Sequence, residues 1–557
     1  MPGTTLGAQL LGAQLGTSTQ LGAATRTALG PHSTGQPTVT SLAVANPGSL
    51  IQSVDWVAIA PPLIAALAAL AVLVADLFLP ARHKKLLGRL TAAGLALALI
   101  ALLPLTGGSP RATFCAQNVT GVTDTPLTSG SATAGCSYVA DHFALVFQLL
   151  ALGGALIAAL LSAHTVDDEK LPAGEYWFLL LSSATGAALL PASRDLATLV
   201  IALEVASLPA FALVALRRDG RGAEAALKFF LSSVTATAVM LLGIGFVYAA
   251  SGSLHLAAVA DGLEHAPAQL KPLAEAGAVL TLVGFAFKVA AVPFHFWVPD
   301  TYTGAPLPVA GYLSVVGKAA GLSGLALVTA ISFRPYAHTW GLVLAVLAAA
   351  TMTVGNVGAL RQRFDTRYSA VRLLAWSSIG QAGYLLVPLA AAGYAPTGTD
   401  PLGATAAYAL IYGVVNLGAF GVVAAVGRRA GTSVDDYRGL FARRRWTALA
   451  LAFFLLCLAG LPPGVIGLFG KVVVFRTAVD SGLGWLAVVM AVNVVIALYY
   501  YLLWTARLFA PAEGATAVAE RRLPASLAAT LGLTASVAVV LSVVPQLVLQ
   551  VVGGTLF

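Results

Sequence analysis

Apolar runs of about 20 residues recur along this chain, and short polar segments separate them. A helix of that length crosses roughly 30 Å of hydrocarbon. The pattern therefore predicts an all-α polytopic membrane protein. Its fourteen expected spans are residues 55–79, 86–107, 140–163, 174–191, 195–215, 222–250, 273–303, 306–333, 338–360, 368–389, 402–427, 446–476, 482–508 and 524–553.

The composition excludes other classes of protein. Of 557 residues, 58% are hydrophobic and 10% are charged, against roughly 25% charged in a soluble domain. Three Cys are too few for a disulfide-stapled secreted fold. The net charge of +8 is attributed to Lys and Arg held at a membrane surface, so the lipid bilayer is an expected partner and nucleic acid is not.

The basic residues indicate an orientation. Alternate loops hold 20 of the 31 Lys and Arg, and the opposite loops hold 6. Because Lys and Arg concentrate on the cytoplasmic side, we expect both termini to face outward. Residues 1–50 are rich in Gly, Thr, Ala and Gln and do not have the pattern of a signal peptide, so they are interpreted as a disordered external extension.

Two cysteines, Cys115 and Cys136, fall in the outward loop after the second span. An oxidising compartment would permit a disulfide between them. Two free thiols in one loop are an equally good interpretation, so both alternatives stay open.

Half of the eight lysines lie inside expected spans, and these are Lys228, Lys288, Lys318 and Lys471. Each charge costs about 2.5–3.5 kcal/mol at the centre of a lone helix. Lys, unlike Arg, releases a proton when it is buried, so the series is a candidate proton relay. Lys228 lies near the inner end of its span, where its side chain could instead reach the head groups.

Two further ionisable residues extend this candidate relay. Glu204 lies among Leu and Val, and a static salt bridge is the alternative to a proton-linked role. His295 follows Lys288 by seven residues, or about 10 Å along a helix. It titrates near neutral pH, although a purely structural histidine would fit the same position.

Proline interrupts two spans in similar ways. The seventh carries Lys288 and then Pro293, and the twelfth carries Pro462, Pro463 and then Lys471. These spans are five apart and run in opposite directions. Spans 4–8 (174–333) and 9–13 (338–508) therefore read as two inverted five-helix repeats, each with a broken helix. The first three helices (55–163) precede these repeats, and one last helix (524–553) follows them.

Several of these segments resemble the antiporter-like subunits of respiratory complex I, the NADH-quinone oxidoreductase. The most specific match is FKVAAVPFHFWVPDTYTGAP at 287–306, with Lys288 and His295. The others are EVASLPAFALVAL around Glu204, EAALKFFLSS around Lys228, VVGKAAGL around Lys318 and LAGLPPGVIGLFGKVVVF around Lys471. The likeness covers about residues 55–555.

The resemblance implies a proton-translocating membrane-arm subunit of a bacterial plasma-membrane complex. Glu204 and Lys288 would form an ion pair, with Lys228 assisting from the cytoplasmic side. Lys318 would be the central carrier, linked to Lys288 by His295, and Lys471 would lie toward the exit. One departure concerns Gln381, which stands where many relatives carry His and which cannot titrate.

The family also suggests partners and rival functions. The partners are an M-type antiporter-like subunit and small K-, J- and A-type subunits, while NADH, FMN, iron–sulfur clusters and quinone would be bound by partner subunits and not by this chain. A cation/proton antiporter subunit of the same fold is the alternative function. A lipid-linked transferase would need interfacial acidic clusters, and the DDE at 167–169 and the DD at 435–436 look like solvated loop charge.

Overall fold

A computed structural model describes residues 54–115, 135–395, 400–427, 433–511 and 523–552. The extension expected over residues 1–50 lies outside this described part. The described residues all belong to one compact unit.

Helices occupy each of the fourteen predicted spans. In chain order they are α1 (Trp56–Phe78), α2 (Lys85–Ile100), α3 (His142–Asp168), α4 (Ala173–Leu189), α5 (Leu196–Ala215), α6 (Gly220–Ser251), the pair α8 (Lys271–Val289) and α9 (Trp297–Gly304), the run α10 (Leu307–Tyr312) and α11 (Lys318–Leu327), α12 (Ala337–Leu360), α13 (Ser369–Ala391), α14 (Pro401–Val426), the pair α16 (Arg445–Ala459) and α17 (Val465–Asp480), α18 (Gly484–Phe509), and α19 (Ala525–Val543) with α20 (Gln546–Val552). Among the described residues, twelve helical segments are long and apolar enough to cross a membrane. The two spans outside those twelve are α4, which is short, and the broken pair α16/α17.

Aspartate begins five of these helices. Its carboxylate accepts hydrogen bonds from backbone N–H groups of the first turn, which have no partner inside the helix. The five are Asp55 of α1, Asp141 of α3, Asp195 of α5, Asp219 of α6 and Asp400 of α14. Five of the chain's 23 acidic residues therefore stand at helix N-termini.

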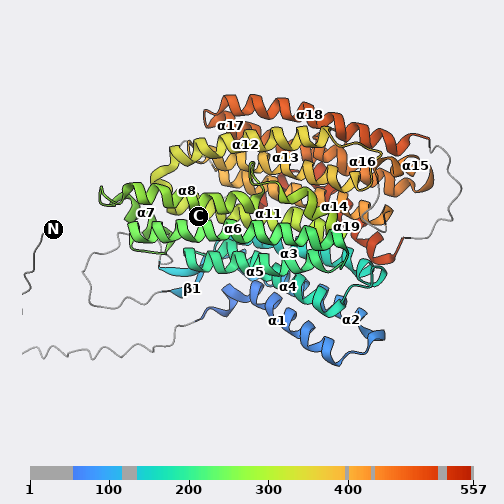
Figure 1. Cartoon of the computed structure of the whole chain (residues 1–557), viewed down its shortest axis with the longest axis horizontal. Helices are drawn as coiled ribbons and strands as arrows, with labels where there is room; N and C mark the ends of the chain where they lie inside the picture. Colours follow the sequence, from blue (N-terminus) through green and yellow to red (C-terminus); the bar gives the residue numbers. More distant parts are fainter. Residues whose placement is uncertain (1–53, 116–134, 396–399, 428–432, 512–522, 553–557) are drawn as a thin grey trace, which may run out of the picture. The chain divides into compact units, whose positions relative to one another are not determined.

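Other short elements lie between the spans. Helix α7 (Leu256–Glu264) follows α6, and α15 (Leu440–Arg443) precedes α16. In both views the β-strands and α7 lie at one end of the helices, and α15 lies at the opposite end in Figure 1. The sequence pattern predicted neither helix, because each is too short to cross a membrane.

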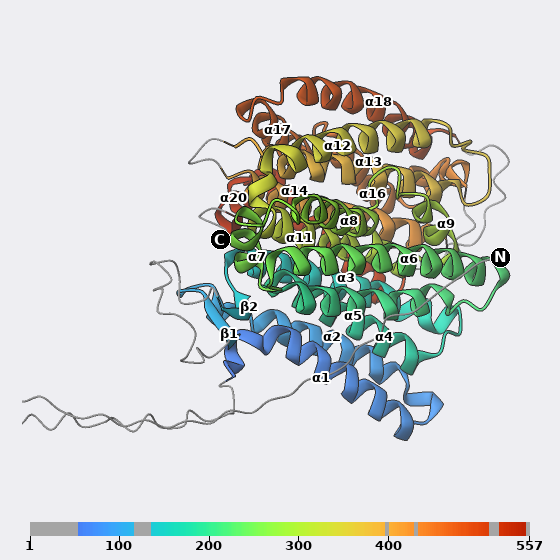
Figure 2. The ribbon, with the colours of Figure 1, turned by 60° about the vertical axis from the view of Figure 1, so that its left-hand side comes forward.

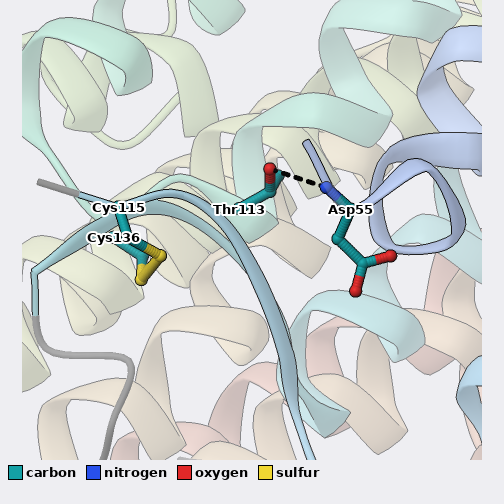
Figure 3. Close-up of a disulfide and its surroundings, with 4 residues drawn as sticks. All are labelled: Asp55, Thr113, Cys115 and Cys136. Carbon is teal, nitrogen blue, oxygen red and sulfur yellow. Dashed lines mark hydrogen bonds between the residues drawn. A yellow bond between two sulfur atoms is a disulfide. The ribbon is translucent and has the colours of Figure 1, made fainter. Parts of the chain in front are cut away.

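A hairpin of two strands, also absent from the expectation, lies between α2 and α3. Strands β1 (Arg111–Cys115) and β2 (Cys136–Ala140) are antiparallel, and Cys115 stands opposite Cys136. The two sulfurs are joined in a disulfide (Figure 3).

The hairpin is tied to the start of α1. The backbone N–H of Asp55 donates to Oγ1 of Thr113 at 3.1 Å (Figure 3), and Nε of Arg111 lies 2.7 Å from the Asp55 carboxylate. This hydrogen bond from Arg111 holds the pKa of Asp55 below its usual range.

The two proline-broken helices end in the same way. Helix α8 is followed by Ala290 in the left-handed region at φ 64°, and α16 by Gly460 at φ 85°. In each case the next backbone N–H returns to a carbonyl five residues earlier, from Ala291 to Ala286 and from Leu461 to Leu456, both at 2.9 Å. This is a Schellman cap, which stops a helix and satisfies its last carbonyls.

Small residues let the central helices approach closely. Helices α12 and α13 pack side by side, as do α6 and α8 (Figures 1 and 2). A Cβ added to Gly355 of α12 would overlap the backbone nitrogen of Gly380 on α13. Close backbone contact of this kind drives helix association in lipid. Helix α13 is the most enclosed of these twelve segments, with 94% of an 18-residue apolar stretch buried.

Candidate functional site

The first charged pair joins α5 to the end of α8. The ammonium nitrogen of Lys288 lies 3.9 Å from Oε1 of Glu204, and it donates to Oγ of Ser207 at 2.7 Å and of Ser233 at 2.8 Å. Glu204 in turn accepts from Thr237 Oγ1 at 2.8 Å. Hydroxyl groups from α5 and α6 thus surround a buried ammonium whose carboxylate partner stands just beyond hydrogen-bond distance.

A small cavity extends from Lys288 toward α10 and α11. It measures about 30 Å³, enough for one or two water molecules. Its polar lining comes from Lys288, Ser183, Ser207 and Tyr312, and its far wall includes Gly317, the residue before Lys318. The cavity therefore leads from one buried lysine to the backbone beside the next.

Lys318 begins α11 directly after a π-helical turn at Leu313–Gly317. Its side chain is only 1% exposed, and its ammonium donates to Oγ of Ser378 at 2.6 Å and to the carbonyl oxygen of the same residue. Within the described part of the chain, no carboxylate lies within 4.0 Å of this nitrogen. Lys318 is thus a buried ammonium held by neutral oxygens.

Polar side chains of α14 extend the hydrogen-bond network around Ser378. The hydroxyl of Tyr412 donates toward Ser378 Oγ at 2.9 Å and toward the Ser314 carbonyl oxygen at 3.1 Å. Asn416 donates to Ser314 Oγ at 2.6 Å. These contacts fix both the serine that holds Lys318 and the π-helical turn that precedes it.

Lys471 lies at the second helix break. Its ammonium donates to the carbonyl oxygens of Leu458 and Ala459, each at 2.7 Å. These carbonyls end α16, where the break leaves them without helical partners, and the helix dipole favours a cation there. The ammonium also lies 5.4 Å from the centre of the Tyr384 ring.

Gln381 lies on α13 between the surroundings of Lys318 and those of Lys471. Its Nε2 is 3.4 Å from the Leu458 carbonyl that also binds Lys471, and 3.3 Å from the Tyr501 hydroxyl. Its Oε1 accepts from Tyr408 at 2.5 Å. The position that departs from the family pattern is therefore fully engaged in hydrogen bonds.

Lys228 is placed apart from the buried lysines. Its side chain is 50% exposed and pairs with Glu224 at 2.7 Å and with Asp300 at 3.0 Å. Arg372 approaches the same Asp300 at 4.0 Å. Lys228 is thus part of a charged cluster on the flank of α6 and α9.

His295 lies in the break between α8 and α9 and is half-buried. Its ring centre is 5.7 Å from that of Trp376, and its Nδ1 has no hydrogen-bond partner among the described residues. No contact seen in the described chain joins it to Lys288 or Lys318. The hydroxyl groups that bind those lysines belong to Ser207, Ser233 and Ser378.

Sequence reasoning missed the hydroxyl groups that hold the charges. Ser207 follows Glu204 by three residues and so lies on the same helical face, which was a usable signal. Ser233, Ser378 and Tyr412 come from other helices, and only the fold brings them to the lysines. No group of three or more His, Cys, Asp or Glu that could hold a metal occurs in the described residues.

Comparisons with known proteins agree with this architecture. Residues 193–497 match a family model described as NADH:quinone oxidoreductase/Mrp antiporter, TM. The chain is 62% identical to NADH-quinone oxidoreductase subunit N 2 of Streptomyces griseus, over 94% of this chain and 97% of that one. It is 44% identical to subunit N of Salinispora tropica, over 82% and 85% of the two chains.

Solved structures give the same picture. A chain of respiratory complex I from Thermus thermophilus is 33% identical, with a TM-score of 0.70 over 89% of this chain and all of that one. A chain of the Mrp complex from Dietzia has a TM-score of 0.73 over 89% and 96% of the two chains. At 21% identity, that second likeness shows the fold alone.

Proposed function

The chain belongs to the NADH:quinone oxidoreductase/Mrp antiporter family as a subunit N of NADH-quinone oxidoreductase, and we propose that Glu204, Lys288, Lys318 and Lys471 are its proton relay. It is a proton-translocating membrane-arm subunit, and its partners are other membrane-arm subunits of that complex. Electron transfer from NADH to quinone takes place in other subunits of the complex, and it drives proton movement through this chain. We propose no redox centre in this chain.

One observation carries the relay assignment, namely the surroundings of Lys318. A structural ion pair needs a carboxylate, and the described chain places none within 4.0 Å of this ammonium. A permanently charged, unpaired ammonium in the hydrocarbon core is costly. A lysine that alternates between charged and neutral forms does not carry that cost throughout the cycle, so a relay accounts for the site better than a static charge.

The remaining residues take roles along this path. The Glu204 carboxylate biases Lys288 toward its charged form when the two lie close. The 30 Å³ cavity supplies room for water between Lys288 and the start of α11. The exposed cluster around Lys228 would collect protons at the cytoplasmic side. His295, with Nδ1 unpartnered in the described chain, would take part only through water.

The repeat organisation belongs to the same proposal. Residues 174–333 and 338–508 would be inverted repeats, with 55–163 before them and 524–553 after them. The matching Schellman caps at Ala290 and Gly460 support this division. In transporters, broken helices of this kind place polar backbone where it lines a path for ions.

The expected environment also follows from the proposal. The complex would lie in a bacterial plasma membrane with both termini of this chain outside. The disulfide hairpin lies at one end of the helices and the Arg-rich segment around α15 at the other (Figure 1), which fits an oxidising exterior and a basic cytoplasmic face. NADH, FMN, iron–sulfur clusters and quinone would all be bound by partner subunits.

Replacement of Lys318 with Met in the intact complex tests the relay. The variant removes the ammonium and keeps a long side chain, so we expect the complex to assemble and proton pumping to fall. Lys170→Met, in an exposed loop, is the matched control. Normal pumping by assembled Lys318→Met complexes would overturn the proposal.

A further inference from the structure

The link between Lys318 and Lys471 presents a chemical difficulty. Two groups lie between these lysines. They are the amide of Gln381, which does not titrate, and the carbonyl of Leu458, which only accepts hydrogen bonds. Lys471 and Gln381 both donate to that one oxygen. A proton therefore has no direct route from Lys318 to Lys471 through these two groups.

A second set of hydrogen bonds, through Tyr412, bypasses Gln381 and Leu458. Its hydroxyl has one proton and two acceptors, Ser314 O at 3.1 Å and Ser378 Oγ at 2.9 Å. When it donates to Ser314, a lone pair of its oxygen is free to accept from the Ser378 hydroxyl. Tyr412 can therefore receive a hydrogen bond from the serine that holds Lys318.

The side chain of Tyr412 also borders a cavity. This space of about 10 Å³ is lined by Tyr408, Tyr412, Gln381 and Leu458, among others. That volume is the lower limit for one water molecule, and a buried water needs two to four polar partners. The two hydroxyls, the amide and the carbonyl supply them.

We propose that Tyr412 is a relay residue that passes the proton between Lys318 and a water in this cavity, bypassing the amide of Gln381. This inference rests on the proposed function of Lys318. The ammonium gives a proton to Ser378 Oγ, whose own proton moves to the Tyr412 oxygen, and the Tyr412 proton, which turns from the Ser314 carbonyl toward the cavity, moves to the water. The Ser378 and Tyr412 oxygens each gain one proton and lose one, Lys318 becomes neutral, and the water carries the proton as hydronium, so no redox change is needed.

Gln381 then acts as a positioning residue. Because its Oε1 accepts the only hydroxyl proton of Tyr408 at 2.5 Å, the Tyr408 oxygen turns its lone pairs toward other groups. The cavity water can donate to that oxygen. The amide thus orders the water without itself taking part in proton transfer.

Substitutions at Tyr412 in the intact complex test the inference. Tyr412→Phe keeps the ring and removes the hydroxyl, and we expect at least a fivefold fall in proton pumping with normal assembly. Tyr412→His restores a group that both accepts and donates a proton, and we expect partial recovery. A structural role predicts the opposite order, because His fits a ring-shaped apolar site less well than Phe.

Tyr176→Phe is the matched control, since it removes an equally buried hydroxyl that bonds to Ser162 at 2.7 Å on α3. Normal pumping by Tyr412→Phe would overturn the inference. If Lys318→Met is defective in that case, the proposed relay stands and only its Tyr412 step fails. If Lys318→Met also pumps normally, both fail.

Discussion

Removal of the Glu204 charge should slow proton-coupled turnover with little effect on assembly. Two unit charges at the observed 3.9 Å attract by about 4 kcal/mol at an effective dielectric constant of about 20. If one third of this attraction contributes to the barrier of the limiting proton transfer, its loss slows turnover about tenfold. We therefore expect Glu204→Gln, which keeps an oxygen for Thr237, to be about as defective as Glu204→Ala.

A shorter carboxylate should retain part of the activity. Glu204→Asp withdraws the charge by about 1.5 Å, which leaves about 3 kcal/mol of attraction on the same scale. The expected order of coupled turnover is therefore wild type, then Asp, then Gln and Ala. That order depends on charge and distance, whereas a packing role would place Gln above Asp.

The assay compares NADH oxidation and proton uptake in inverted membrane vesicles, with complex assembly checked by native gel electrophoresis. Glu175→Gln is the control, because this exposed carboxylate stands in the first turn of α4. Wild-type coupled turnover in assembled Glu204→Gln complexes would refute the ion-pair reasoning.

Two further predictions concern the architecture. Thiol alkylation of the native complex should leave Cys115 and Cys136 unmodified until a reductant is added, and labelling of both without reductant would contradict the disulfide. Gly467→Ala should prevent assembly, because its Cβ would overlap the carbonyl oxygen of Cys457. Gly484→Ala, whose Cβ would meet no atom within 4 Å, should assemble normally, and equal yields of the two variants on native gels would contradict this packing.

The spans could be predicted because their signal is local. Lipid requires about 20 apolar residues per crossing, and proline interrupts a helix wherever it stands in the interior. The fourteen spans and the breaks after Lys288 and before Lys471 therefore follow from sequence alone. The hairpin did not, since five-residue strands in a polar loop resemble any other loop until a partner strand pairs with them.

The candidate site could likewise be predicted only in part. Charged residues within spans were visible because their cost in lipid makes them rare. Their surroundings were not, since Ser378 lies 60 residues from Lys318 in the chain and reaches it only through helix packing. The distance expected between His295 and Lys288 assumed one continuous helix, but the break at Ala290 ends that helix, and the ring packs near Trp376. The link from His295 to Lys318 came from the family resemblance and stays a prediction.

The central claim is that Lys318 releases and regains a proton, and Lys318→Arg tests it most directly. Arg preserves a positive charge but does not deprotonate in proteins. The measurement is the number of protons translocated per NADH oxidised by assembled complexes. A relay predicts a ratio well below that of wild type, while a wild-type ratio would show that only the charge of Lys318 is needed and would contradict the account.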